Sequence, residues 1–187
     1  MEKIFRKLSY FFVKKWQLGV LDIDRGCWCV APELKNIKYL KAENAQGQGR
    51  HILVQPLPEV APYYLLIDDI NWPIIKHHHC KADKTWKKGR MVIETSPENY
   101  QVWIHSSNAM SIDNKRYWLK QLHSDPGSDP NKRWGRCPGF RNRKEKYRDP
   151  GSRYPLSKLI WVDWKYQVKI PQIESEEKNK KIICRSD

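Results

Sequence analysis

The sequence predicts a two-layer α+β domain with a mostly antiparallel sheet. Segments with the alternation or the apolar runs of β-strands are interleaved with segments of helical periodicity. Two strand-like segments, Met91–Glu94 and Tyr100–His105, flank a short polar turn, which is typical of an antiparallel hairpin. The length of 187 residues suits one domain with a substantial core.

The first third of the chain predicts two helices and three strands. Apolar residues such as Phe5, Leu8 and Phe12 recur at helical spacing, in a segment too short and too charged for a signal peptide or a membrane span. Pro32 suits the first turn of a helix. We expect a helix over Met1–Gln17, strands over Gln17–Ile23, Trp28–Ala31 and Arg50–Pro56, and a helix that starts at Pro32 and ends before Gly47.

The most apolar stretch is Pro62–Ile70, in which five aromatic or aliphatic residues precede two carboxylates, as in a buried strand. Alternation along Tyr100–His105 places Gln101, Trp103 and His105 on one face of its strand. Helices are expected over Trp72–Cys80 and Ile112–Leu122. Together these elements predict a single domain over residues 1–170, with its core at 18–147, and a charged, disordered tail over 171–187.

The net charge of +14 favours a polyanionic partner. The charge is concentrated: Asn131–Lys158 contains ten Lys or Arg against two acidic residues, a net charge of +8. No amphipathic basic helix covers this segment, so a membrane surface is the weaker explanation. A phosphate-binding face is therefore expected there, with a solubilising surface as the alternative.

The cysteines and clustered histidines predict neither a disulfide framework nor a zinc site. The five cysteines are odd in number and scattered, which indicates reduced thiols in a cytoplasmic protein. Consecutive residues of a helix point in different directions, so His77–Cys80 cannot converge on one ion. A solvated helix end is the expected structure of that cluster.

Four carboxylates predict a divalent metal site. Asp68 and Asp69 follow the apolar strand, and both can serve one site only if the backbone turns there, because side chains alternate along a regular strand. Asp125 and Asp129 lie in a later loop. Carboxylates from separate loops suit a two-ion site for phosphoryl transfer with Mg²⁺ or Mn²⁺. The alternative is plain turn chemistry, since Asp-Pro-Gly and Asp-Pro are common in loops.

The basic segment interleaves cations with aromatic residues. Trp134 and Phe140 stand among the Lys and Arg residues, which suits base stacking as well as ordinary packing. The cations could hold a triphosphate or a template backbone. The residues concerned are Arg133, Arg136, Arg141, Arg143, Lys144 and Lys146.

Four blocks of this sequence resemble those of the RepB-type plasmid primases. The first, Tyr39–Ile52, is similar to the family's LKxxNAxGxHI block, with an apparent insertion at Gln48–Gly49. The others are Leu65–Ile70, Ile93–Trp103, and Asp125–Asp129 with Arg136–Lys144, the last resembling an RxPGFxNRK signature with Cys137 in place of an aliphatic residue. The blocks follow the family's order and cover roughly residues 39 to 147.

The resemblance implies an archaeo-eukaryotic primase core, which is RRM-like, and a DNA primase or primase-polymerase that makes short primers in plasmid or mobile-element replication. It implies metal ligation by Asp68, Asp69 and Asp125, with Asp129 as the second choice for the third ligand. It also implies that nucleotides contact Gln101, His105, Arg136, Asn142, Arg143 and Lys144. Single-stranded DNA is expected on Arg133, Trp134, Arg141 and Lys146.

The partners implied are a single-stranded DNA template, nucleoside triphosphates and a replicative helicase or initiator. The sequence shows no helicase motif and no helical bundle of the kind primases use to grip template. The competing hypothesis is a non-catalytic module that binds single-stranded nucleic acid or initiates replication on the same fold. Divalent metal would stabilise the enzyme against heat and do little for the binding module.

Overall fold

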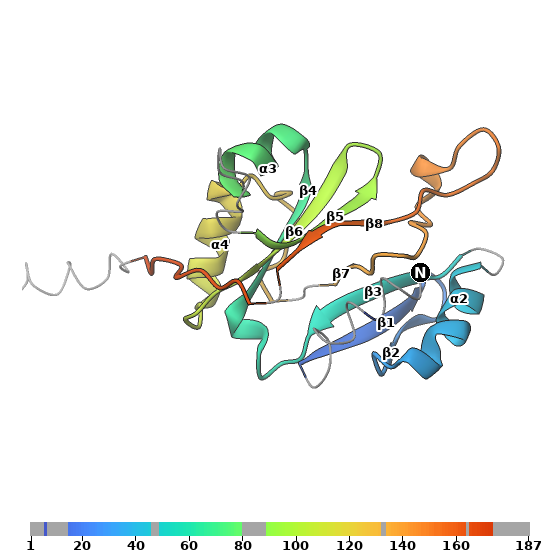
Figure 1. Cartoon of the computed structure of the whole chain (residues 1–187), viewed down its shortest axis with the longest axis horizontal. Helices are drawn as coiled ribbons and strands as arrows, with labels where there is room; N and C mark the ends of the chain where they lie inside the picture. Colours follow the sequence, from blue (N-terminus) through green and yellow to red (C-terminus); the bar gives the residue numbers. More distant parts are fainter. Residues whose placement is uncertain are drawn as a thin grey trace, which may run out of the picture.

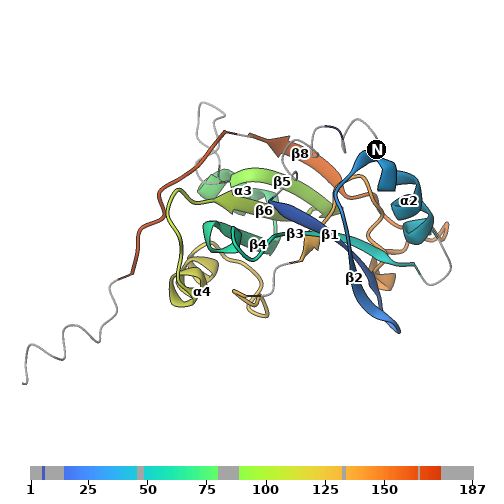
Figure 2. The same cartoon turned by 90° about the horizontal axis from the view of Figure 1, so that it is seen from below.

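The computed structural model describes residues 6, 15–45, 49–79, 89–131, 134–163 and 165–173. Two four-stranded antiparallel sheets, with strand orders β2-β1-β3-β7 and β4-β6-β5-β8, lie one above the other (Figure 1). The view from below shows the same two sheets and places α4 beyond one end of the second (Figure 2). This arrangement confirms the predicted α+β class, with the antiparallel strands divided between two sheets.

The first sheet is built around a central strand pair. Its strands are β1 (Trp16–Asp22), β2 (Gly26–Val30), β3 (His51–Pro56) and β7 (Gly135–Arg136). Gly19 of β1 pairs with Leu53 of β3, and Leu53 pairs with Arg136 of β7. The short β7 therefore brings the start of the basic segment to the edge of this sheet. Trp16, which we expected in the N-terminal helix, instead begins β1, and Gln17, the residue shared by the predicted helix and strand, lies in β1.

The second sheet contains the predicted hairpin. Its strands are β4 (Tyr64–Ile70), β5 (Gly89–Ser96), β6 (Asn99–His105) and β8 (Lys158–Val162). β5 and β6 pair in antiparallel fashion around a tight turn, β4 pairs with the other side of β6, and β8 closes the far edge on β5. β4 is thus one of the two edge strands of the second sheet, and the acidic pair lies on it.

The helices are short. They are α2 (Ile37–Ala45), α3 (Trp72–His79) and α4 (Ile112–Gln121), with 3-10 turns η1 (Leu34–Asn36), η2 (Ala61–Tyr63) and η3 (Glu145–Tyr147). The Ser111 hydroxyl caps α4 by accepting from the backbone of Asn114 at 3.1 Å. Within the described part of the chain, no helix is long and apolar enough to cross a membrane.

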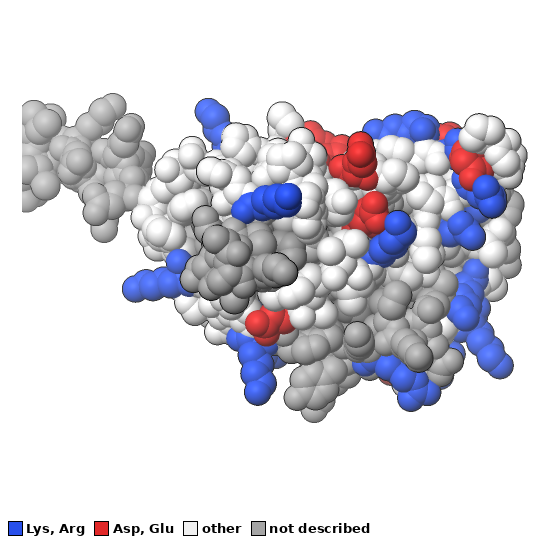
Figure 3. Space-filling model, turned by 45° about the horizontal axis from the view of Figure 1, so that its top comes forward, with Lys and Arg blue, Asp and Glu red and all other residues white. Residues whose placement is uncertain are grey.

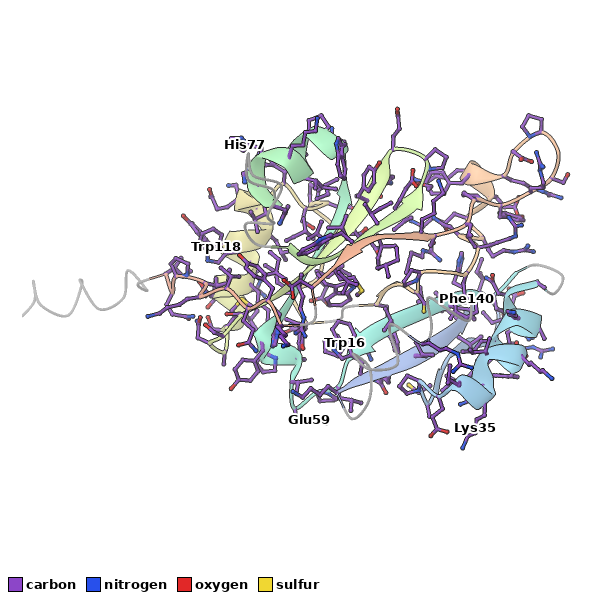
Figure 4. The ribbon with its side chains drawn as sticks, in the orientation of Figure 1. Trp16, Lys35, Glu59, His77, Trp118 and Phe140 are labelled. Atoms are coloured by element: carbon purple, nitrogen blue, oxygen red, sulfur yellow. The ribbon has the colours of Figure 1, made fainter. Side chains whose placement is uncertain are left out.

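Two cores hold these layers together. One lies between the sheets, where Trp16 meets Tyr64 and Trp103 edge to face at ring-centroid distances of 4.9 and 4.6 Å. Trp16 and Phe140 both lie between the sheets in Figure 4. The other core packs α3 and α4 against the opposite face of the second sheet, through residues such as Ile75 and Leu119.

The alternation predicted along β6 is confirmed at its centre. Trp103 faces the core between the sheets, and Val102 and Ile104 face the core under α3 and α4. Gln101 shares the Trp103 face and is only 4% exposed, so this polar residue needs hydrogen-bond partners inside the protein. Of the rest of the helix predicted at the N-terminus, the described residues include only Arg6 and Lys15. Cys80 and most of the predicted tail also lie outside the described residues.

Candidate active site

Asp68 and Asp69 lie at a bulge near the end of β4. The register between β4 and β6 shifts between Ile67 and Ile70, and Asp69 has a left-handed backbone with φ of 57°. The backbone turn that both carboxylates needed is therefore a bulge within the strand, which resumes at Ile70. The Asp69 N–H donates to Asp68 Oδ1 at 2.8 Å, so the bulge also orients the first carboxylate.

Asp68 is tied to β6 and to the acidic loop. Gln101 Nε2 donates to Asp68 Oδ1 at 2.8 Å, and the Asp68 N–H donates to the Ser124 hydroxyl at 3.0 Å. The Asp125 N–H in turn donates to the Asp68 carbonyl at 3.0 Å. These contacts fix the loop that carries Asp125 beside the end of β4.

Burial raises the pKa of Asp68, and the hydrogen bond from Gln101 opposes that rise. A charged carboxylate in this position is disfavoured by desolvation and by its neighbour Asp69. A bound cation would remove both penalties. The electrostatics of the donor set therefore suit a divalent ion with oxygen ligands.

A small pocket joins the two acidic segments. Its volume is about 210 Å³, and its lining includes Asp68, Asp125, Asp129 and Trp134. Asp125 and Asp129 also accept backbone hydrogen bonds within their own loop, from Gly127 at 2.9 Å and from Asn131 at 2.8 Å. The turn chemistry that the sequence offered as the alternative is thus present alongside the acidic pocket.

No three His, Cys, Asp or Glu side chains in the described ranges are grouped closely enough to hold a metal ion as they stand. Asp68, Asp125 and Asp129 share one pocket, and Asp69 lies next to Asp68. The residues fit a carboxylate-bound Mg²⁺ or Mn²⁺ in type and location. Closing the coordination shell requires side-chain movement or oxygen atoms from a substrate.

Cations gather around Arg136, which Gln101 joins to Asp68. The Arg136 N–H donates to Gln101 Oε1 at 2.7 Å, and the Arg136 guanidinium contacts His51 Nδ1. Burial lowers the pKa of Arg136 to about 10, against the attraction of Asp68 and Asp69, so it remains charged at neutral pH. Gln101 therefore links Asp68 to the backbone of the half-buried Arg136.

His51 lies in this cationic group as a neutral side chain. Burial, followed by the charges of Arg136, Lys144 and Arg143, lowers the pKa of His51 to about 4. More broadly, Lys and Arg side chains visible in Figure 3 gather at the right-hand end of the molecule, over α2 and the segment that follows β7. This cationic group, defined by His51, Arg136, Arg143 and Lys144, suits a polyphosphate.

Two residues of the basic signature hold the fold. Asn142 is 2% exposed, and its Nδ2 donates to the Thr95 carbonyl at 3.0 Å. The Arg141 N–H donates to Asn44 Oδ1 at 2.7 Å, and its guanidinium contacts the Tyr154 carbonyl. Their hydrogen bonds go to protein groups, which leaves Lys144 and Lys146 as the exposed cations of this segment nearest the acidic pair.

The remaining predicted residues are spread more widely. His105 pairs with Tyr64 at the opposite end of β6 from Gln101, stacks on its ring at 4.5 Å and contacts Arg90. The structure therefore does not bring His105 to Asp68. Phe140 is 1% exposed and packs in the core. Arg133 lies outside the described residues.

Sequence reasoning missed three residues that the structure places at the site. His51 belongs to the cationic group, and Asn99 Nδ2 donates to Asp69 Oδ1 and, at 3.2 Å, to Tyr147 Oη. His51 and Asn99 stand inside two of the blocks that carry the family resemblance, which was the available signal. Nothing in the local pattern of Tyr147 indicates its contact with Asn99.

Comparisons with known proteins show what this chain is similar to. The chain matches the sequence model of the RepB DNA-primase N-terminal domain over residues 7–180. It is 29% identical to Mobilization protein A of Escherichia coli over 79% of this chain, and 27% identical to a DNA primase of Acidithiobacillus ferrooxidans over 72%. These alignments span 21% and 38% of the two relatives, so the chain corresponds to a fraction of each.

Solved structures show the same fold. The catalytic domain of primase RepB′ in complex with initiator DNA superimposes with a TM-score of 0.70 and 23% identity, over 89% of this chain and 87% of that one. Primase RepB′ itself superimposes with a TM-score of 0.69 and 25% identity, over 88% of this chain and 57% of that one. The archaeo-eukaryotic primase domain of the cyanophage S-2L primase-polymerase superimposes with a TM-score of 0.58 and 7% identity, over 89% of this chain and 92% of that one.

Proposed function

Because the chain belongs to the RepB DNA-primase N-terminal domain family, we propose that it catalyses template-directed, metal-dependent nucleotidyl transfer on single-stranded DNA. The observation that carries the proposal is the hydrogen-bonded chain from Asp68 through the Gln101 amide to the backbone N–H of Arg136, which places a half-buried cation beside the acidic pair. Such adjacency of carboxylates and cations is what a site for a metal-bound triphosphate requires.

The proposed reaction joins two nucleotides. The 3′-hydroxyl oxygen of one attacks the α-phosphorus of an incoming triphosphate, its proton passes to solvent, and the bond to pyrophosphate breaks. Divalent ions, held by Asp68, Asp69 and Asp125, would neutralise charge on the phosphates. The pocket shared by Asp68, Asp125 and Asp129 supports this assignment, with Asp129 as the alternative third ligand.

The protein's own cations would hold the triphosphate. Arg136 is half-buried and charged, so part of its side chain is already ordered when it donates to phosphate oxygens. Lys144 and Lys146 are exposed and can reach a bound anion. Neutral His51 donates a hydrogen bond through Nε2 when Nδ1 accepts from Arg136.

The bulge and its hydrogen bonds would position the acidic pair. The Asn99 side chain donates a hydrogen bond to Asp69, and the Gln101 side chain donates one to Asp68. The side-chain oxygen of Gln101 accepts from the Arg136 backbone N–H. These contacts limit the rotamers of both carboxylates before any substrate binds. A role in plasmid or mobile-element replication is supported by the likeness to Mobilization protein A.

A priming assay tests the proposal. The wild-type protein, single-stranded DNA, all nucleoside triphosphates and Mg²⁺ or Mn²⁺ are expected to yield short primers, and Asp68→Asn/Asp69→Asn is expected to yield none while still binding DNA. Asp113→Asn is a matched control, because this exposed carboxylate pairs only with Arg116 among the ion pairs of the described residues. DNA binding without synthesis by the wild type would favour the non-catalytic binding module.

A further inference from the structure

A second, larger hollow adjoins the acidic pocket. Its volume is about 510 Å³, and it lies between the end of β3, η2 and the start of α4. Trp134 lines both this hollow and the acidic pocket. The two spaces are therefore neighbours that share Trp134 in their lining, and a ligand in the acidic pocket could extend past Trp134 into the larger one.

The lining of the larger hollow is mostly apolar. Pro56, Pro62, Met110 and Ile112 contribute to it, and Gln55 and Asn131 offer amide groups. Among the described residues that line it, Lys115 is the one with a charged side chain, and its Nζ donates to the Ala61 carbonyl at 2.7 Å. An apolar hollow with a few amides, of a size within the range of about 300–1,000 Å³ for small-ligand sites, suits a nucleobase with its sugar.

The hollow and the cationic group lie at opposite ends of β3. His51 begins β3 at the cationic group, and Gln55, four residues further along the same strand, lines the hollow. At about 3.3 Å per residue, the two are about 13 Å apart. In nucleotidyl transfer the attacking and leaving oxygens are roughly in line. A triphosphate on the cationic group therefore leaves the hollow to the nucleotide that attacks.

The Trp134 indole is held in place by a glycine of β1. A Cβ atom added to Gly19 would lie 2.8 Å from two ring atoms of Trp134 and 3.2 Å from Cys27 Sγ. Any side chain at position 19 would thus push the indole away from the sheet. Close packing on one face of the ring reduces its freedom, which favours stacking on a base.

We propose that the hollow binds the base and sugar of the nucleotide that supplies the attacking 3′-hydroxyl, with Trp134 as its stacking surface. This assignment rests on the proposed nucleotidyl transfer. It gives the site two functional ends: the triphosphate lies on the cationic group, and the nucleotide to be extended lies in the hollow. Gly19 is a positioning residue that acts through Trp134.

The test is an equilibrium binding measurement that needs no catalysis. A fluorescent DNA hairpin with a recessed 3′ end is compared with the same hairpin lacking the base of its 3′-terminal nucleotide, by anisotropy in Mn²⁺. The wild-type protein is expected to bind the intact hairpin about 5- to 150-fold more tightly, the range for loss of one stacked base. Trp134→Leu and Gly19→Ala are expected to lose this preference, and Trp134→Phe to keep most of it.

Two controls separate the proposal from its alternatives. Trp118→Leu removes an indole whose Nε1 donates to the Pro171 carbonyl, away from the hollow, and is expected to keep the preference. Equal binding of both hairpins by the wild type would overturn the proposal. A third hairpin lacks a base in the template strand instead. If only the loss of that template base weakened binding, the hollow would serve the template, and the proposal would also be overturned. Repeating the measurement with Asp68→Asn keeps this result independent of whether the protein synthesises primers.

Discussion

Gln101 donates to Asp68 at 2.8 Å across the β4–β6 pair, and the other end of the same amide accepts from the Arg136 backbone at 2.7 Å. The amide thus links the second sheet to β7, one of the two edge strands of the first sheet. Because Gln101 is 4% exposed, water cannot replace either partner. The geometry of the candidate site depends on this one side chain.

Replacing Gln101 by Leu is expected to impair both stability and activity. The change removes one of the two N–H donors to Asp68 Oδ1 and the acceptor of the Arg136 backbone N–H, at a cost of about 1–3 kcal/mol in the free energy of unfolding. Urea unfolding measures that cost, and the priming assay measures the loss of synthesis. Gln172→Leu, at an exposed position, is the control expected to change neither.

Asp68→Asn is expected to have opposite effects without and with metal. Burial raises the pKa of Asp68, so its charge destabilises the metal-free fold, and the uncharged Asn relieves that penalty. In metal-free buffer the variant should melt at or above the wild-type temperature. In Mn²⁺ the order should reverse, because an ion that binds only the folded wild type stabilises it, by about 2.7 kcal/mol at a concentration 100 times its Kd. A wild-type melting temperature that Mn²⁺ leaves unchanged would contradict the metal assignment.

The left-handed backbone of Asp69 predicts a ranking of substitutions. Asn tolerates φ of 57° almost as well as Asp, whereas a β-branched residue is strained there. Asp69→Val is expected to lower the free energy of unfolding by about 1–2 kcal/mol relative to Asp69→Asn. Urea denaturation of the two variants in metal-free buffer measures the difference. Equal stability would mean that the bulge is absent in solution.

His51 predicts a loss of stability on acidification. Its pKa is about 4 in the folded protein and near 6.5 when unfolded, so between those values the unfolded chain binds more protons. The free energy of unfolding should fall as pH drops from 6.5 towards 4, by up to about 3 kcal/mol from this residue. Urea unfolding of wild type and His51→Gln across that range isolates its part, since His105, with a pKa of about 3, titrates in both proteins.

The local elements of the fold could be predicted from the sequence. The β5–β6 hairpin, the helix that follows Ser111 and the buried strand that carries Asp68 all have patterns that depend on neighbours in the chain. The pairing of Asp68 with a loop that holds Asp125 was also expected, because the residue types favour metal binding. These inferences needed no knowledge of how the sheets pack.

The tertiary structure decided which polar residues meet. A two-residue strand such as β7 has no periodicity to read, yet its pairing with Leu53 carries Arg136 to Gln101 and His51. His105 and Gln101 share a face of β6, but only the pairing with β4 shows that Gln101 meets Asp68 while His105 meets Tyr64.

Residue type and alternation along one strand therefore determined the chemistry that this protein can offer. Contacts between distant segments determined where that chemistry is assembled. Gly19 of β1 packs against Trp134, and Asn142 donates to the Thr95 carbonyl of β5. Neither contact leaves a signal in the surrounding sequence, because each depends on two segments far apart in the chain that come together only when the sheets pack.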